Sequence, residues 1–479
     1  MHKTPHFDPA RPHTVPRIAA CALFMQNLDA TAVTTALPQI ARSLGRAPLE
    51  LSLVVSIYVL ALAVCLPIGG WLADRFGARR VFVAALGSFA FFSACCALSS
   101  SLTELVIART LQGASASLMG PIARLLVLQT VPKDRLIRAN AQMALPALVG
   151  PVTGPLVGGF MATYLSWHWI FLINIPIGLL GIALSLRFIP DLPGNEPDKL
   201  DPLGLVLCAG ALAAILFGLD KFHDPDLDLI IPAGLVSTGL LCAIGYVAQS
   251  RRVSRPALDL SLLRHPTYRM AIVGGTLFRI TTGAMPFLLP LMLQLGLGVS
   301  AMTSGSLTFA AALGSIGMKA WVPKLLSRFG FRSALTSNAV IAAALISGYA
   351  FVGATTAFWI IWTLGFFSGI SRSLQFAAVN TLAYAEIEKE ETSRANTLYA
   401  VVQQVSVSLG VAISSLILTI TMWLLGTDAP PDMAVFNITF VVMALFALAS
   451  SVMFLQLPTD AGATLSGHRP PIRSSETAD

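Results

Sequence analysis

The chain has 479 residues, of which 55% are hydrophobic and 11% are charged, and its mean hydropathy is +0.74. Soluble domains carry about 25% charged residues, so this composition excludes a soluble globular protein. The formal charge of +7 does not indicate nucleic-acid binding, because the basic residues lie in small groups between apolar segments. The six cysteines lie inside apolar segments without ligand or disulfide spacing, so we expect neither a metal nor a cofactor.

Apolar runs long enough to span a membrane occur about fourteen times, which predicts an all-α polytopic membrane protein. In chain order they lie near residues 17–38, 51–72, 81–100, 104–128, 141–163, 167–188, 202–220, 229–249, 269–293, 301–322, 333–353, 355–378, 398–422 and 434–456. The connections are short, and none can hold a soluble domain. The functional site is therefore expected inside the membrane bundle.

Basic residues predict the orientation of the chain. Lys and Arg residues outside the spans concentrate in the termini and in alternate loops, with Arg42, Arg46 and Lys221 as the exceptions. The positive-inside rule then places the N-terminus in the cytoplasm, and an even number of spans places the C-terminus there too. The N-terminal segment has no small-residue cleavage site, so we expect the first helix to be retained.

The first apolar segment contains a single carboxylate, Asp29. At about 1.5 Å per residue from Arg17, it lies roughly 18 Å deep, near the middle of a hydrocarbon layer about 30 Å thick. An acid there costs about 2.5–3.5 kcal/mol, so it is expected to face the bundle interior or a water-filled cavity and to mark a proton or ion path. The alternative is a structural Asp that is hydrogen-bonded to Gln26, Asn27 or Thr31.

Arg109, in the fourth span, is the candidate partner of Asp29. It lies about 9 Å from the outer end of its span, and Asp29 lies about 13 Å from the same side. The depths are compatible with a direct ion pair. An Arg that extends to the outer interface is the alternative. Two further basic residues, Arg279 and Arg372, lie well inside second-half spans, where they either line a cavity or pair with polar groups.

The loop after the second span is a candidate gating element on the cytoplasmic face. Its residues of interest are Gly70, Asp74, Arg75, Gly77, Arg79 and Arg80. Asp74 can cap or pair with helix ends, and Gly77 permits the positive φ that a tight reversal needs. A plain turn that carries positive charge is the alternative.

The three residues Arg75-Phe76-Gly77 recur as Arg328-Phe329-Gly330 after the tenth span. Aligning them equates the first six spans with the last six, an arrangement typical of secondary transporters with a midplane site. The predicted units are a cytoplasmic tail (1–16), a six-helix bundle (17–188), a linker with two inserted helices (189–268), a second six-helix bundle (269–456) and a second cytoplasmic tail (457–479).

The fifth span combines regularly spaced glycines with prolines. Its residues of interest are Gly150, Pro151, Gly154, Pro155, Gly158 and Gly159. Glycines at every fourth position give one flat face for close helix contact, and the prolines remove backbone donors and bend the helix. Generic packing of small residues explains the glycines but not the two prolines in phase with them.

These stretches resemble motifs of the major facilitator superfamily. The loop at Asp74 is similar to its G-x-L-a-D-r-x-G-r-k pattern, with Ala78 where the family has a basic residue. Arg109, Gln112 and Gly113 match its R-x-x-Q-G motif, which is implicated in proton transfer. The fifth span resembles its antiporter motif G-P-x-x-G-G, which is found in proton-driven exporters.

Two more stretches resemble the fourteen-helix drug:proton antiporter-2 family of that superfamily. Residues 28–38 are similar to its L-D-x-T-x-v…A-L-P motif, and residues 167–178 are similar to its W-R-W-I-F-x-x-N-x-P-x-G run, with His168 in place of the Arg. The resemblance implies two six-helix bundles plus two inserted helices. It also implies a charge-relay clasp at the Asp74 loop, between helices 2 and 11.

The resulting hypothesis is a proton-coupled exporter of amphipathic or lipophilic small molecules, with cations among the candidates, in the inner membrane of a bacterium. Asp29 would carry the proton with Arg109 as its partner, and the cavity candidates are Asn27, Gln112, Arg279 and Arg372. The expected partners are the substrate, protons and the lipid bilayer. An importer or symporter of the same fold and a non-transporting scaffold are the alternatives. An enzyme is not expected, because no nucleophile with a base and no nucleotide loop is evident.

Overall fold

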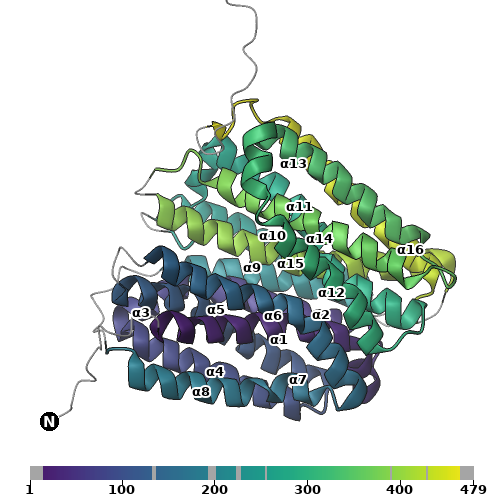
Figure 1. Cartoon of the computed structure of the whole chain (residues 1–479), viewed down its shortest axis with the longest axis horizontal. Helices are drawn as coiled ribbons and strands as arrows, with labels where there is room; N and C mark the ends of the chain where they lie inside the picture. The colour runs from purple at the N-terminus through teal and green to yellow at the C-terminus, as the bar shows by residue number, and fades with distance from the viewer. Residues whose placement is uncertain are drawn as a thin grey trace, which may run out of the picture.

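The structure, a computed structural model, describes residues 14–131, 136–191, 201–222, 228–253, 256–388, 391–427 and 430–463, which form helices and no strands. The helices pack as two halves (Figure 1). The first half contains α1 (Thr14–Leu44), α2 (Ser52–Cys65), α3 (Ile68–Phe76), α4 (Ala78–Leu98), α5 (Leu102–Thr130), α6 (Leu136–Tyr164), α7 (His168–Leu172) and α8 (Asn174–Phe188). The second half contains α11 (Pro266–Leu291), α12 (Ala301–Met318), α13 (Val322–Gly348), α14 (Phe358–Ala383), α15 (Thr392–Leu425) and α16 (Met433–Leu455).

The backbone of the two halves repeats at the Arg-Phe-Gly sequences. Gly77 separates α3 from α4 with φ of 88°, and Gly330 interrupts α13 with φ of 70°. Only glycine adopts such φ values without a steric cost, so both turns depend on the missing side chain. The first residues of α13, up to Gly330, thus correspond to α3 in the first half.

Three predicted spans depart from a single straight α-helix. The second consists of α2 and α3, whose axes meet at 54°. Pro67 lies at this break and lacks the N–H that would continue the helical hydrogen bonds. The sixth is divided between α7 and α8, and α11 ends in a π-helical turn at Met292–Gly296.

Length and apolarity qualify nine helices of the described chain as candidate membrane spans, or ten if α2 and α3 form one bent span. The expected total of fourteen therefore stays a prediction. The long helices α1, α6, α12 and α14 are not among the candidates. All four of these helices line the cavity between the halves, where small and polar side chains replace apolar ones.

The halves meet through matching helix pairs: α6 packs on α12, and α2 packs on α15. The inserted helices α9 (Pro202–Lys221) and α10 (Ile230–Ser250) pack on each other. α9 also contacts both α2 and α15, so the inserted pair lies along one of the two boundaries between the halves (Figure 1).

The contact between the halves is closed at the end of the molecule where α1 finishes. A single hydrophobic cluster there joins first-half residues such as Leu37 to second-half residues such as Leu289 and Phe436. Gln294 donates to the Thr35 carbonyl at 2.8 Å and accepts from Gln39 at 2.9 Å. Toward Thr14, at the opposite end, most of each half belongs to its own core, although Ala63 of α2 lies in the second-half cluster. The broadest apolar contact between the described parts of the halves is therefore at the end where α1 finishes.

Candidate functional site

Asp29 and Arg109 form a buried ion pair inside the first half. Asp29 lies on α1 and Arg109 on α5, and Arg109 Nη1 is 2.6 Å from Asp29 Oδ2. Both residues are only 1% exposed. The matched depths estimated from the sequence thus correspond to a direct contact. A pair this deep is strongly sensitive to the loss of either partner, because the remaining charge would be uncompensated.

Amide side chains satisfy the second carboxylate oxygen of Asp29. Asn174, at the start of α8, donates to Oδ1 at 2.7 Å, and Gln112 donates to it at 3.2 Å. Both amides also donate to the Ser93 hydroxyl on α4, at 2.9 and 3.1 Å. Four helices therefore meet at one carboxylate, and the network fixes its position.

The guanidinium of Arg109 lies against an aromatic ring. Its Cζ is 4.0 Å from the centroid of the Tyr58 ring on α2, and Nη1 also donates to Gln112 Oε1 at 2.7 Å. A Cβ at Gly113 would overlap the Tyr58 carbonyl, so glycine is needed for α5 to approach α2 this closely. The R-x-x-Q-G motif thus supplies Arg109, its hydrogen-bond partner Gln112, and Gly113, which lets α5 lie close to α2.

The neighbours proposed for a structural Asp29 are not the ones observed. Asn27 donates to the Leu23 carbonyl and Thr31 to the Asn27 carbonyl, both within α1. Sequence reasoning missed Asn174 and Ser93 as partners of the carboxylate network. A polar Asn inside the otherwise apolar sixth span was the available signal for Asn174.

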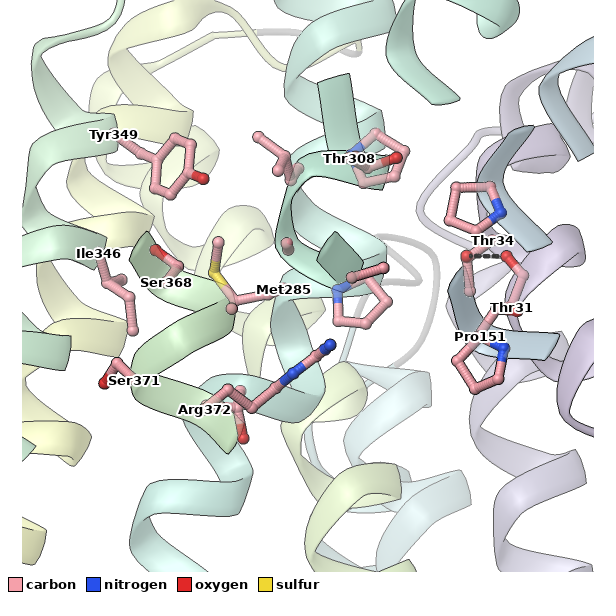
Figure 2. Close-up of a pocket in the computed structure, with 18 of the residues that line it drawn as sticks. Thr31, Thr34, Pro151, Met285, Thr308, Ile346, Tyr349, Ser368, Ser371 and Arg372 are labelled. Atoms are coloured by element: carbon pink, nitrogen blue, oxygen red, sulfur yellow. Dashed lines mark hydrogen bonds between the residues drawn. The ribbon is translucent and has the colours of Figure 1, made fainter. Parts of the chain in front are cut away.

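A cavity of about 100 Å³ lies between the halves and does not include Asp29. Figure 2 shows Thr31 and Pro151 on one side and Ile346, Tyr349 and Ser368 on the other. On α1, residues 29 and 31 point about 200° apart, so one helix presents Asp29 to α5 and α8 and its threonines to the cavity. α1 therefore links the ion pair to the cavity wall.

Arg372 is the charged residue of the cavity lining. Its guanidinium extends toward the middle of the cavity (Figure 2) and donates to Ser315 Oγ at 3.2 Å. No acidic side chain belongs to the described lining, and no carboxylate of the described residues forms an ion pair with Arg372. The cavity is thus lined by apolar groups, hydroxyls and one cation.

The other three candidate cavity residues lie elsewhere. Gln112 is held by the Asp29 network, and Asn27 by its own helix. Arg279 is buried within the second half, where it donates to the Tyr399 hydroxyl and lies 4.7 Å from the centroid of the Tyr399 ring. None of the three belongs to the lining of this cavity, although Nη1 of Arg279 has no hydrogen-bond partner in the described chain. A role of these residues in a substrate cavity stays a prediction.

The glycine-proline stretch of α6 contacts both halves. A Cβ at Gly150, Gly154 or Gly158 would collide with α1, so the expected flat face is the α1 contact surface. Gly159 packs against the Ala301 carbonyl at the start of α12 in the same close manner. Pro151 and Pro155 line the cavity. α6 therefore connects α1, the cavity and the second half.

The Asp74 loop is exposed in this conformation. Arg79 donates to the Leu186 carbonyl at 2.6 Å, and Arg80 is 3.0 Å from Asp191. Both contacts join the loop to the end of α8. Arg75 lies over the Trp71 ring at 5.3 Å, and a Cβ at Gly70 would meet open space.

Asp74 is exposed, and no ion pair to it is found within the described ranges. The charge-relay clasp that the family resemblance predicts for this loop is therefore not formed by the described residues. It stays a prediction for a conformation in which the halves close at this end.

Two repeated helical halves, closed at one end around a cavity, define a polytopic membrane transporter. The sequence profile described as Major Facilitator Superfamily matches residues 19–411, and the chain belongs to this family.

The chain is 36% identical over 444 residues to the protein of Serratia proteamaculans named multidrug resistance protein MdtD, covering 92% of this chain and 93% of that protein. It is 37% identical over 434 residues to the Haemophilus influenzae protein named transport protein HsrA, covering 90% and 93%. Among solved structures, the peptide transporter POT in complex with sulfate aligns with a TM-score of 0.69 at 16% identity, covering 93% of this chain and 94% of that one. That likeness concerns the fold.

Proposed function

We propose that the chain is a proton-coupled exporter of amphipathic or lipophilic small molecules that works by alternating access. The names of its relatives support multidrug efflux, and the antiporter-like stretch of α6 supports export over import. The observation that carries the proposal is the position of α1, which bears the buried Asp29–Arg109 pair on one face and part of the cavity wall on the other.

Asp29 is sealed from water in this conformation, so proton exchange requires a second one. Protonation would remove the charge of Asp29 and weaken its attraction to Arg109, which favours a conformation in which the two side chains separate. Movement of α1 would then change the cavity wall at Thr31 and Thr35. A proton and a substrate that favour opposite conformations are coupled through this one helix.

The expected orientation gives this cycle a direction. With both termini in the cytoplasm, the closed end of the structure would face outward and the opposite end would face the cytoplasm. A substrate would enter the cavity from the cytoplasm, and proton entry from outside would drive its release there.

Proton flux in sealed proteoliposomes tests the proposal. A panel of amphipathic compounds of each charge is added to vesicles with an internal pH dye, and at least one is expected to change the internal pH with the intact protein. Asp29→Asn should abolish this change, whereas Asp460→Asn, which removes an exposed carboxylate, should preserve it. Undiminished flux in a correctly inserted Asp29→Asn protein would contradict the assignment of Asp29.

A further inference from the structure

Arg109 is fully buried and paired with a carboxylate, whereas the half-buried Arg372 has no anion beside it among the described residues. Arg109 is neutralised by Asp29 at 2.6 Å. In the described part of the chain, the hydrogen bonds of the Arg372 guanidinium consist of the one to Ser315 Oγ, a neutral group. A guanidinium has five N–H donors and stays charged, so most of its binding capacity remains unused.

A cation inside a membrane bundle without a counter-charge indicates a functional site. Arg residues at this depth almost always pair or face a polar cavity, because an unpaired charge there is costly. A carboxylate fits the planar guanidinium with two parallel hydrogen bonds. The lining of the cavity contains no such group among the described residues, so a ligand can supply it.

The rest of the lining defines the other part of the ligand. Phe278, Met285 and Leu289 give it an apolar wall. Hydroxyl groups from both halves, among them those of Thr31, Thr308 and Ser371, also belong to the lining. The cavity therefore combines an apolar wall with polar groups besides Arg372.

We propose that this cavity binds amphipathic organic anions, with Arg372 pairing with the carboxylate of the ligand and the apolar wall holding its hydrocarbon body. This inference rests on the proposed function as an exporter and names its substrate class. Cationic amphiphiles fit the lining less well, since Arg372 would repel them and none of the described lining residues is a carboxylate that would attract them.

Three probes that share one aromatic body test the charge preference: 1-naphthoate, 1-naphthylmethanol and 1-naphthylmethylammonium. Binding to the purified full-length protein is measured by calorimetry. Naphthoate should bind most tightly and the ammonium compound most weakly. Charged hydrogen bonds of this kind correspond to roughly a 10- to 100-fold difference in affinity. Equal or tighter binding of the ammonium compound would overturn the proposal.

Variants of Arg372 test whether this residue is the origin of the preference for the anionic probe. Arg372→Gln should lose the advantage of naphthoate over naphthylmethanol, and Arg372→Lys should retain part of it, because an ammonium keeps the charge but not the planar pair of donors. Arg279→Gln is the matched control, since it removes a buried arginine of the same half that lies outside the cavity. Retention of the full preference by Arg372→Gln would overturn the proposal. If a variant does not fold, the three probes on the unmodified protein still decide.

Binding and transport fail independently in these experiments. Proton-coupled transport of the ammonium compound without naphthoate binding would leave the exporter intact and refute the anion site. Naphthoate binding that depends on Arg372, without transport of any compound of the panel, would refute the exporter and support the site.

Discussion

The two halves share a backbone repeat but treat buried positive charge in opposite ways. In the first half, Arg109 has a carboxylate at 2.6 Å and amides around it. In the second half, Arg279 contacts the hydroxyl and ring of Tyr399 and the ring of Phe376, with no carboxylate beside it in the described residues. The Arg109 charge is therefore neutralised within the first half. The second half instead holds Arg279 in its interior without a described carboxylate and presents Arg372 to the cavity.

The packing of the halves, by contrast, is alike. α6 approaches α1 at Gly158, and α15 approaches α11 at Gly410. A Cβ at either glycine would overlap a carbonyl of the facing helix, that of Ala32 or that of Ile280. The two halves thus have equivalent helix packing but different buried charges. This difference suits the proposal that the first half carries the proton while both halves enclose the substrate.

Replacement of the two arginines gives the largest expected effect. Arg109→Gln should destabilise the protein by about 3–5 kcal/mol, because it leaves the Asp29 carboxylate buried without its partner. Arg279→Gln leaves no such charge and should cost less, about 1–3 kcal/mol for a lost hydrogen bond and ring contact. The loss of stability in both variants is measured by heating the purified proteins and monitoring, by size-exclusion chromatography, how much folded protein remains. An Arg279→Gln protein as unstable as Arg109→Gln would break the comparison.

The double replacement of Asp29 by Asn and Arg109 by Gln sharpens that result. It removes both charges and keeps hydrogen-bonding amides of similar shape, so most of the stability lost in Arg109→Gln should return. Proton-coupled transport should stay absent. Failure to recover stability would mean that the ion pair is not the origin of the loss.

Glycine replacements test whether the halves pack alike. Gly158→Ala and Gly410→Ala should each lower stability by about 1–3 kcal/mol, since the added methyl group meets a backbone carbonyl. Gly70→Ala is the matched control, because its Cβ would meet open space. Melting temperatures of the three purified variants make the measurement. A loss at only one of Gly158 and Gly410 would show that the packing is not equivalent.

The smallest expected effect concerns the hydrogen bonds that join the halves at the closed end. Gln294→Ala removes two of them, each contributing about 0.5–1.5 kcal/mol. Hydrogen–deuterium exchange of residues 289–299 should rise several-fold as that end opens more often. Gln456→Ala, at an exposed position, should leave this exchange unchanged. Equal exchange in both variants would mean that these bonds do not hold the closed end.

Local patterns predicted much of the first half. Hydropathy identified the helices, and the Arg-Phe-Gly repeat correctly marked two equivalent turns, because a positive φ leaves a clear glycine signal. The sequence predicted similar depths in the membrane for Asp29 and Arg109, and the ion pair between them agrees with that prediction. The glycines of α6 revealed their contact face because their spacing follows the helix period.

Rotation about the helix axis was not predictable in the same way. Arg279 and Arg372 look alike in the sequence, but Arg279 turns toward Tyr399 and Arg372 turns into the cavity. Asn27 and Gln112 also lie outside the lining of this cavity, because which face a polar residue takes depends on neighbours distant in sequence. The bend at Pro67 and the partner role of Asn174 depend on such contacts as well.

Proton release on substrate binding tests the central claim most directly. The purified protein is placed in unbuffered solution, and a transported compound from the proteoliposome panel is added while the pH is recorded. If proton and substrate compete through α1, their linkage is reciprocal and binding should release about one proton per molecule. Asp29→Asn should bind the compound and release none. Equal release by the Asp29→Asn protein would contradict the claim that this carboxylate carries the proton.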